Sequence, residues 1–281
     1  MTEGMIIVTK LEDLFYTRTL LDGPVGLVPT MGYLHAGHIS LVRQAKIECK
    51  SVIATIFVNP TQFGPHEDLA SYPRNLENDL RLLEQAGVNI VWTPATEDMY
   101  PPDFQTWVEV ENLTSLLEGS MRPGHFRGVT TIVSKLFNAT RPDKSYFGQK
   151  DAQQAAVIRQ MTRDLSYPID IVICRTQREA DGLAMSSRNA YLTTDQRKAA
   201  DILYRALLAA QTAFDDGEKN AETLRQIVKD VLATEHQAQL QYVSCADYDT
   251  LKELDTLSGK ALLSLAVFIG KTRLIDNFIL G

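Results

Sequence analysis

Cysteine is scarce in this sequence, and its placement excludes two classes of protein. The three cysteines, Cys49, Cys174 and Cys245, are odd in number, widely spaced and set in apolar stretches. Disulfide frameworks of small secreted domains use even, closely spaced sets, and zinc sites commonly use CxxC pairs, of which this sequence has none. The cysteines therefore predict reduced, buried thiols in a cytoplasmic protein.

Long apolar runs and an excess of positive charge are also lacking. The most apolar later stretch, ALLSLAVFIG at 261–270, is too short to span a bilayer, and the first ten residues lack the pattern of a secretory signal. The formal net charge is −7, whereas coating of nucleic acid depends on lysine and arginine. We therefore expect neither a membrane nor a nucleic-acid partner. The P-loop pattern GxxxxGK[ST] is missing too, so a nucleotide would need another binding device.

Short apolar runs alternate with amphipathic segments through the first two thirds of the chain. The apolar runs predict buried strands at 25–30, 51–59, 88–92, 144–148 and 169–174. Apolar residues three and four apart predict helices at 39–50, 75–86, 129–140 and 152–165. Because parallel neighbours in a sheet need a crossover between them, this rhythm predicts an α/β fold with a Rossmann-like, doubly wound parallel sheet.

The pattern changes after residue 190. Two helical stretches, 193–217 and 220–236, precede three strand candidates at 240–248, 261–270 and 272–280. Consecutive helices followed by consecutive strands are typical of an α+β unit. We therefore predict two domains, a Rossmann-like domain at 1–184 and a smaller C-terminal α+β domain at 185–281.

The stretch PTMGYLHAGHISLV at 29–42 places two histidines at the predicted start of a helix. A helix N-terminus offers unpaired backbone N–H groups to phosphate, and His35 and His38, three residues apart, would point the same way and donate further hydrogen bonds. Two other interpretations remain. A loop histidine is more often structural than catalytic, and an HxxH pair can hold a metal, with His66 or His125 as a third ligand.

Three further polar clusters each follow a predicted strand. They contain neutral amides, a Lys-Asp pair with a nearby glutamine, and a Ser-Ser-Arg run, listed in chain order as Asn59, Gln62, Lys150, Asp151, Gln154, Ser186, Ser187 and Arg188. Amides suit a substrate that bears hydroxyls and a carboxylate, and the cations suit phosphates. Because parallel strands end at the same edge of a sheet, all the clusters are expected to converge there.

A run of positive charge spans these clusters. Between Gly119 and Lys150 there are six lysines or arginines and one acidic residue, Asp143. Such a run can attract an anionic small molecule, or it can be a solvated basic face. The sequence leaves both interpretations open.

These stretches resemble the pantothenate synthetase (pantoate:β-alanine ligase) family of HIGH-motif nucleotidyltransferases. The matching stretches are VPTMGYLHAGHISLV, FVNPTQFGPHEDLASYPR, MRPGHFRGV, FGQKDAQQ and READGLAMSSRNAYL. The similarity covers essentially the whole chain and is densest between residues 26 and 192. One position departs from the family, since Gln149 stands where a glutamate usually precedes the Lys-Asp pair.

The resemblance implies an ATP-dependent ligase with two chemical steps at one site. ATP and (R)-pantoate would form an enzyme-bound pantoyl adenylate and pyrophosphate, and the amine of β-alanine would then displace AMP to give pantothenate. It further implies that the protein is a homodimer and that its binding partners are small-molecule substrates. Mg²⁺ would bridge phosphate oxygens, with Asp79 as a candidate indirect ligand. The domain at 1–184 would bind ATP and pantoate, and that at 185–281 would act as a lid.

The resemblance also assigns site residues. ATP would be bound by Met31, Gly32, Tyr33, Leu34, His35, Ala36, Gly37, His38, Gly148, Gln149, Lys150, Asp151, Gln177, Met185, Ser186, Ser187 and Arg188. The catalytic set would be His35, His38, Lys150, Ser186, Ser187 and Arg188, with His38 as the proton donor. Pantoate would be bound by Asn59, Gln62 and Gln154, and β-alanine by Gln62.

Three other functions share parts of this pattern. A nucleotidyltransferase acting on a phosphate would share the histidine turn but would not need the Gln62 and Gln154 pair. A tRNA synthetase would need an anticodon-binding region and a basic surface, for which this acidic chain is too short. A non-catalytic nucleotide-binding module would have little use for two histidines and a Ser-Ser-Arg loop.

Overall fold

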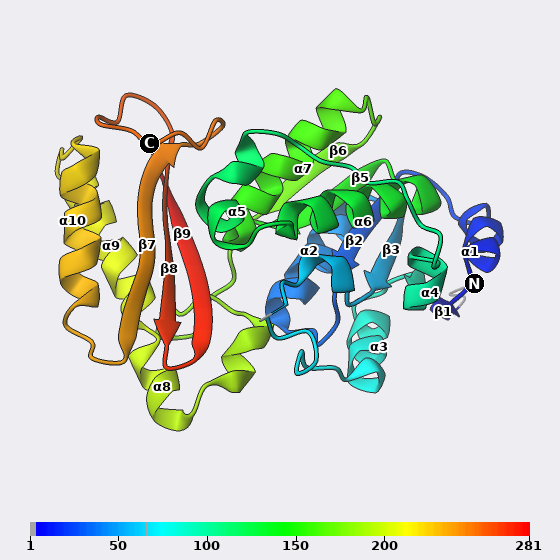
Figure 1. The fold of residues 1–281 in the computed structure, drawn as a ribbon. Helices are drawn as coiled ribbons and strands as arrows, with labels where there is room; N and C mark the ends of the chain where they lie inside the picture. Colours follow the sequence, from blue (N-terminus) through cyan, green and yellow to red (C-terminus); the bar gives the residue numbers. More distant parts are fainter. Residues whose placement is uncertain (1–3, 66) are drawn as a thin grey trace. The chain divides into compact units, whose positions relative to one another are not determined.

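The computed structural model describes residues 4–65 and 67–281, and it divides into two compact units (Figure 1). Unit 1 runs through Gly148 and resumes over Gln154–Arg175, and unit 2 comprises Gln149–Gln153 and Thr176–Gly281. The sequence places the domain boundary at 184/185. The contacts divide the chain at Arg175/Thr176 instead and assign the short segment after Gly148 to unit 2.

Unit 1 contains a six-stranded parallel sheet in the order β1-β4-β3-β2-β5-β6. The strands are β1 (Ile6–Val8), β2 (Val25–Thr30), β3 (Ser51–Ile56), β4 (Ile90–Trp92), β5 (Lys144–Gly148) and β6 (Asp170–Cys174). The central strands read as continuous apolar runs because helices cover both faces of the sheet. This arrangement confirms the predicted doubly wound α/β fold.

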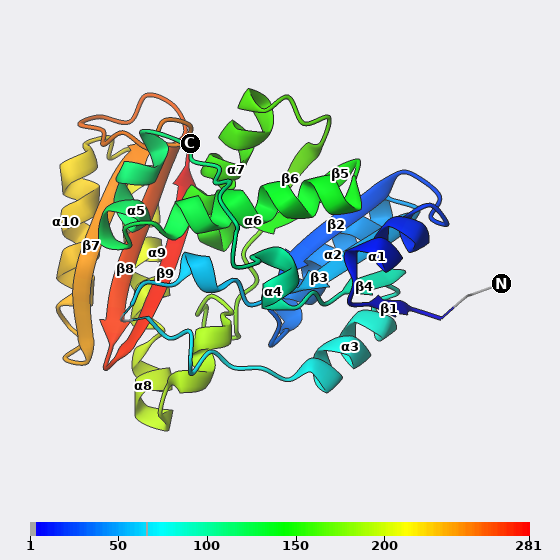
Figure 2. The ribbon, with the colours of Figure 1, turned by 45° about the vertical axis from the view of Figure 1, so that its right-hand side comes forward.

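Helices pack on both faces of this sheet. One apolar core includes residues of α1 (Leu11–Arg18), α6 (His125–Thr140) and α7 (Ala152–Asp164). A second includes residues of α2 (Ala36–Glu48) and α3 (Leu76–Gln85). The remaining short helices are α4 (Thr96–Met99), α5 (Leu117–Met121), η1 (Pro60–Gln62) and η2 (Leu113–Ser115). Figure 2 shows α6 and α1 lying along the strands of this unit.

The connection from β2 to α2 follows the strand at which the chain order of the sheet reverses. β2 pairs with β3 along its whole length, whereas its pairing with β5 covers only Gly26 and Leu27. Pro29, which has no N–H to donate, lies beyond the part of β2 that pairs with β5. The carboxyl ends of β2 and β5 therefore diverge, and ligands of open α/β sheets bind at such a point.

Unit 2 is built on a three-stranded antiparallel sheet, β7-β8-β9. Its strands are β7 (Ala238–Asp247), β8 (Ala261–Ile269) and β9 (Thr272–Leu280), and its helices are η3 (Gln149–Asp151), η4 (Ser187–Tyr191), α8 (Thr194–Ala199), α9 (Ile202–Asp215) and α10 (Ala221–Leu232). α9 and α10 pack on the sheet and share one apolar core with it (Figure 1).

The structure adds elements that the sequence pattern does not reveal. β1 and α1 were not predicted, because a three-residue strand is too short to show a period and α1 leaves several large apolar side chains exposed. The single helix expected at 193–217 is two helices, since a turn at Ala200 and Asp201 separates α8 from α9. Among the described residues, no helix is long and apolar enough to cross a membrane.

Candidate active site

The paired histidines lie where β2 gives way to α2. His35 is the N-cap of α2, and its Nδ1 accepts the N–H of Gly37 at 3.1 Å. Nδ1 of His38 in turn accepts the N–H of His35 at 3.3 Å, and the two ring centroids are 4.1 Å apart. The rings therefore lie side by side, as the sequence spacing predicts, and they satisfy backbone donors of the first helical turn.

In the neutral form of each ring, these contacts select one tautomer. A nitrogen that accepts a backbone N–H carries no proton, so Nδ1 of His35 and of His38 is bare and the proton lies on Nε2. A ring in this state can donate from Nε2 to an oxygen anion. The local backbone thus prepares two hydrogen-bond donors at a helix N-terminus, which itself favours negative charge.

Asp79 of α3 holds the turn that precedes the histidines. Its carboxylate oxygens accept the N–H groups of Tyr33 at 2.8 Å and Leu34 at 2.7 Å, and the residue is 1% exposed. Tyr33 has φ +49°, a conformation that costs free energy for a residue with a side chain. Burial raises the pKa of the Asp79 carboxyl, and the two backbone hydrogen bonds oppose this rise. Asp79 therefore holds the backbone of the turn in place.

Asn59 and Gln62 form the second part of the site in unit 1. Nδ2 of Asn59 donates to Oε1 of Gln62 and to the carbonyl of Gly128, both at 3.1 Å, and Asn59 is 1% exposed. Nε2 of Gln62 points to the sulfur of Met31 at 2.9 Å. Both amide hydrogens of Asn59 are therefore engaged within the protein, and one of them holds the side chain of Gln62. The structure thus brings together Met31, Asn59 and Gln62, which the sequence places in one site.

Gly128 allows α6 to pack closely against the turn that carries Gln62. A Cβ at this position would lie 2.4 Å from the carbonyl oxygen of Thr61 and 2.7 Å from the backbone nitrogen of Gln62. Atoms that close cannot coexist without moving the backbone. The glycine therefore sets the position of η1 relative to α6.

A charged cluster supports the same turn from the other side. Arg122 forms two hydrogen bonds to Glu67, at 2.6 and 2.7 Å, and a third to Nε2 of His125 at 3.1 Å. Arginine can only donate, so Nε2 of His125 is bare and its Nδ1–H donates to the carbonyl of Gln62 at 2.8 Å. Burial, with a further contribution from the charge of Arg122, lowers the pKa of His125 to about 4. His125 is therefore neutral at pH 7.

The metal interpretation of the histidines does not fit these contacts. His125 faces the guanidinium of Arg122, which would repel a cation, and His66 lies outside the described residues. Across residues 4–65 and 67–281, no group of three or more His, Cys, Asp or Glu side chains is arranged to hold a metal ion. The paired histidines are better explained as donors to an anion.

The basic run between Gly119 and Lys150 is not one surface. Besides Arg122, Lys144 is paired with Glu48 at 2.8 Å, Arg127 lies over the ring of Trp107, and Lys135 lies over that of Phe104. Each of these cations has its own partner, because a charge that is partly buried is stabilised by a carboxylate or an aromatic face. Arg127 and Arg141 are exposed, as the solvated-face interpretation expects, and the anion-binding interpretation stays a prediction for Lys150.

In unit 2, the segment with Lys150 is fixed by β9. Nδ2 of Asn277 donates to the carbonyls of Gln149 at 3.0 Å and Lys150 at 2.9 Å, and Nε2 of Gln149 donates to Oδ1 of Asn277 at 3.0 Å. A glutamate carboxylate at position 149 could not make this last donation. The ammonium of Lys150 lies 3.7 Å from the carboxylate of Asp151. Sequence reasoning missed Asn277, since no local pattern marks a residue 127 positions away along the chain.

The Ser-Ser-Arg segment of unit 2 is held by a short hairpin. The N–H of Met185 donates to the carbonyl of Gln177 at 2.9 Å, and Arg178 pairs with Ala184. Ser186 is the N-cap of η4, and its hydroxyl accepts the N–H of Arg188 at 3.2 Å. The structure therefore brings Gln177 next to Met185, and the hydroxyl of Ser186 caps the N–H of Arg188.

Two further residues of unit 1, Gly148 and Gln154, are predicted to contact ATP and pantoate. Gly148 is the last residue of β5, and Gln154 lies in the first turn of α7, where it is half-buried. Both therefore follow from the strand-then-helix order that the sequence predicts.

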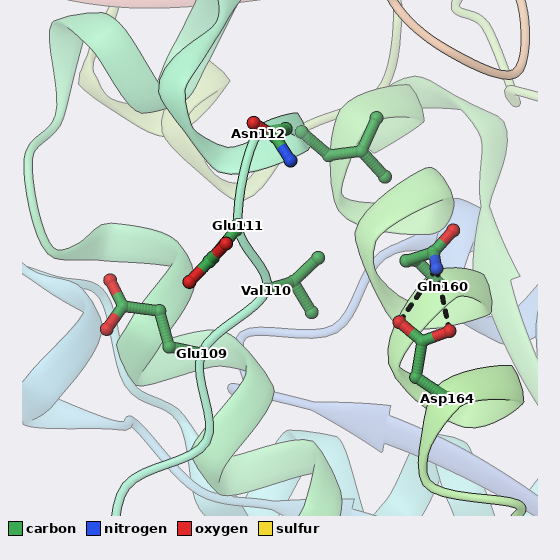
Figure 3. A pocket seen from close by; sticks show the side chains of 7 residues that line it. Glu109, Val110, Glu111, Asn112, Gln160 and Asp164 are labelled. Atoms are coloured by element: carbon green, nitrogen blue, oxygen red, sulfur yellow. Dashed lines mark hydrogen bonds between the residues drawn. The ribbon is translucent and has the colours of Figure 1, made fainter.

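A hollow of about 480 Å³ lies elsewhere in unit 1 (Figure 3). It is lined by Glu109, Val110, Glu111, Asn112, Leu113, Gln160 and Asp164, and Gln160 donates to both oxygens of Asp164. Three carboxylates with no lysine or arginine in the lining would repel ATP and a carboxylate substrate. This hollow contains none of the predicted site residues.

The fold and the histidine turn define the class of protein. A doubly wound parallel sheet with paired histidines at the start of the helix that follows its reversal point is the arrangement of HIGH-motif nucleotide-binding α/β enzymes. Residues 7–279 match the profile of the family described as pantoate-beta-alanine ligase. The chain therefore belongs to the pantoate-beta-alanine ligase family, and it is an enzyme.

Individual relatives agree with this assignment. The chain is 58% identical to the pantothenate synthetase of Herpetosiphon aurantiacus, over 98% of this chain and 100% of the relative. A crystal structure of pantothenate synthetase from Thermus thermophilus is similar with a TM-score of 0.94 and 44% identity, over 98% of this chain and 99% of that one. The pantoate-beta-alanine ligase of Francisella tularensis, solved with beta-gamma ATP and beta-alanine, has a TM-score of 0.82 and 37% identity, over 98% and 97%.

The Asp79→Asn variant should destabilise the protein. The side-chain amide of asparagine has one oxygen and one NH₂ group, so it can accept the N–H of Tyr33 or of Leu34 but not both. One of these buried backbone N–H groups is then left without an acceptor. We expect the free energy of unfolding to fall by about 1–3 kcal/mol in urea titrations. Asp98→Asn is the control, because Asp98 forms a partly exposed pair with Lys10 and such pairs contribute about 1 kcal/mol or less. Equal stability losses in the two variants would contradict the role of Asp79.

The stability of the protein should depend on His125 in mild acid. Its pKa is about 4 in the folded protein and 6.5 in an unfolded chain, so only the unfolded chain gains a proton between these values. Its contribution to the free energy of unfolding is complete above pH 6.5 and is lost as the pH falls to 4, by about 3 kcal/mol.

The measurement is urea unfolding at several values between pH 7 and pH 5, a range in which ordinary carboxylates titrate little. His125→Gln can still donate to Gln62 and accept from Arg122, but it does not titrate, so its stability should change less with pH. His236→Gln should behave as wild type, because the His236 side chain is 89% exposed. An unchanged pH slope in His125→Gln would disprove the assignment.

Proposed function

We propose that this enzyme condenses (R)-pantoate with β-alanine to form pantothenate, through an enzyme-bound pantoyl adenylate, with release of AMP and pyrophosphate. Membership of the pantoate-beta-alanine ligase family supports the overall condensation. The observation that carries the route through an adenylate is the pair of Nε2–H donors at the N-terminus of α2. Activation of the carboxylate by ATP requires donors of this kind for the phosphate oxygens.

The first step joins the carboxylate of pantoate to the α-phosphorus of ATP. A carboxylate oxygen attacks this phosphorus, the bond to the bridging oxygen breaks, and pyrophosphate leaves with the charge that develops. His35 and His38 would donate hydrogen bonds from Nε2 to the phosphate oxygens as this charge develops. His38, the expected proton donor, would share its Nε2 proton with the leaving pyrophosphate in such a hydrogen bond and keep it, because a neutral imidazole that lost this proton would become an anion. Their fixed tautomers mean that neither ring has to rearrange during the reaction.

Gln62 and Gln154 would bind pantoate. Among the described residues, the amide group of Gln62 donates to the sulfur of Met31, which is a weak acceptor, so it can turn to a substrate oxygen at little cost. Asn59 would act on pantoate through Gln62, whose Oε1 it holds. Neutral amides bind a carboxylate without neutralising it, which leaves it nucleophilic.

The second step forms the amide bond. The neutral amine of β-alanine, positioned with the help of Gln62, attacks the acyl carbon of the adenylate. The bond from that carbon to the AMP oxygen then breaks, and the nitrogen loses a proton. Adenylation makes this step feasible because AMP is a far better leaving group than the oxygen of a free carboxylate.

The remaining ATP contacts would come from three segments. Gly148 to Asp151 would hold the ribose and phosphates, the backbone of Gln177 the adenine, and Met185 to Arg188 the triphosphate. Hydrogen bonds within unit 2 support this assignment. They fix the backbone at Gln149 and Lys150, and they join Gln177 to Met185. The domain at 185–281 would act as a lid that shields the adenylate from water.

Mg²⁺ would accompany ATP and neutralise charge on its phosphates. Asp79 is 1% exposed and uses both oxygens on backbone N–H groups, so its contribution would be indirect. Phosphate oxygens and water are the ligands that Mg²⁺ usually keeps in such sites. The homodimer and the cytoplasmic location stay predictions, which gel filtration and cell fractionation would test.

Pyrophosphate exchange tests the adenylate directly. Labelled pyrophosphate should enter ATP when pantoate is present and β-alanine is absent, because only a reversible adenylation returns the label. Exchange that needs β-alanine, or that occurs with unrelated acids alone, would reject the proposed route.

His38 should be required for this exchange. His38→Asn keeps an oxygen that can accept the N–H of His35 but loses the donor at Nε2, and we expect exchange to fall by about 100-fold or more. His236→Asn at the exposed histidine should exchange at the wild-type rate. Near-normal exchange by a folded His38→Asn enzyme would remove His38 from the mechanism.

Replacement of Gln62 should separate the two substrates. For Gln62→Ala we expect the KM for pantoate to rise about 10- to 100-fold, which corresponds to the loss of one or two hydrogen bonds, with little change in the KM for ATP. Steady-state kinetics with each substrate varied in turn give both values. Gln44→Ala is the control, since Gln44 donates to Glu48 within α2. A parallel rise in both KM values would place Gln62 elsewhere.

A further inference from the structure

Strand β9 presents polar side chains on both of its faces. Successive residues of a strand point to opposite sides, so Leu274, Asp276 and Leu280 share the face that packs on the apolar core of unit 2. The structure describes all of β9, and on the other face of this strand Asn277 is the one buried residue. One strand can therefore contact two different segments of the chain.

Asn277 uses its whole side chain on the segment that carries Lys150. Its two amide hydrogens go to the carbonyls of Gln149 and Lys150, and its oxygen accepts from the side chain of Gln149. Asn277 is 5% exposed, so these hydrogen bonds form with little competition from water. The backbone on either side of the Lys150 side chain is thereby fixed to β9.

Asp276 does the same for the hairpin that leads to Ser186. Its carboxylate forms two hydrogen bonds with Arg178, at 2.6 and 3.0 Å, and one with the N–H of Asn277 at 2.8 Å. Arg178 also donates to the carbonyl of Gly182 at 3.0 Å. Gly182 has φ +94°, and a Cβ there would lie 2.0 Å from the ring of Tyr204. The hairpin is therefore closely packed as well as hydrogen-bonded.

We propose that Asp276 and Asn277 of β9 are positioning residues for ATP, which fix the Lys150 segment and the Ser186–Arg188 segment to one strand. This inference rests on the proposed function, in which both segments contact ATP. Neither residue has to touch the nucleotide. Asn277 acts through Lys150, because its hydrogen bonds end on the backbone of that residue.

Positioning matters here because lysine is flexible. A free lysine side chain loses rotamer entropy when it is held in one place. Fixing its backbone beforehand reduces what ATP must order on binding. The same strand sets the second segment, so the two sets of phosphate contacts would share one rigid support.

The test is a double-mutant cycle on the affinity for ATP. The full-length wild-type protein, Asn277→Asp, Lys150→Ala and the double variant are titrated with ATP by calorimetry. Asn277→Asp keeps the size of the side chain but removes both amide hydrogens and places a carboxylate against two carbonyls. We expect about a 10-fold or greater loss of ATP affinity in the wild-type background and less than about 3-fold in the Lys150→Ala background.

A residue that only stabilises unit 2 would behave differently. Its replacement would lower ATP affinity by the same factor in both backgrounds, and that result would overturn the proposal. Asn220→Asp is the matched control, because Asn220 is the N-cap of α10, where an aspartate caps equally well. It should leave ATP affinity unchanged.

Two further measurements keep the test decisive. If Asn277→Asp does not fold by circular dichroism, Asn277→Ser, which keeps one donor and adds no charge, takes its place in the cycle with the same criterion. The KM for pantoate should change less than about 2-fold in the Asn277 variant, since its contacts are confined to the Lys150 segment. An equal rise in the KM values of ATP and pantoate would also overturn the proposal.

The cycle separates this inference from the proposed function. If the wild-type protein binds ATP but shows no pantoate-dependent exchange of pyrophosphate, the proposed function fails and the cycle still reports on Asn277. If exchange occurs and the two replacements act independently, the inference fails and the proposed function stands.

Discussion

Turns that leave a strand expose backbone N–H and C=O groups that the sheet no longer pairs, and buried side chains must satisfy them. In this protein the turns that carry the proposed site residues depend on three such side chains. Asp79 accepts two N–H groups before the histidines, Asn59 supports the turn with Gln62, and Asn277 donates to two carbonyls beside Lys150. Each is 5% exposed or less, so each is a fixed part of the structure. The geometry of the site follows from them.

The residues that would meet the substrates are prepared by this support. Backbone N–H groups fix the tautomers of His35 and His38, and the amide of Gln62 is held by Asn59 at one end and faces a weak acceptor at the other. His125 remains neutral because it is buried beside Arg122. Pantoate and ATP, the substrates proposed for these groups, are anions, and the groups would bind them through hydrogen-bond donors rather than through net charge. The charged residues of the basic run mostly have partners within the protein.

Much of unit 1 is predictable from its sequence. The limits of β2 and β5 were predicted correctly, because a strand buried on both faces is a continuous apolar run. The start of α2 is displaced only slightly, since His35 serves as its N-cap. β1 was missed because three residues show no period. The dense motifs around residues 31–38 and 147–154 led to the family, and the family profile confirms that assignment.

The sequence by itself determined the fold class, the family and the chemical types of the site residues, because apolar period and short motifs are local properties of the chain. Only the tertiary structure decided which side chains hold the functional turns. Asp79 lies 45 and 46 positions from the groups that it binds, and Asn277 lies 127 and 128 from its own. Hydrogen bonds between residues so far apart depend on how the helices and strands pack, and no local pattern encodes that packing.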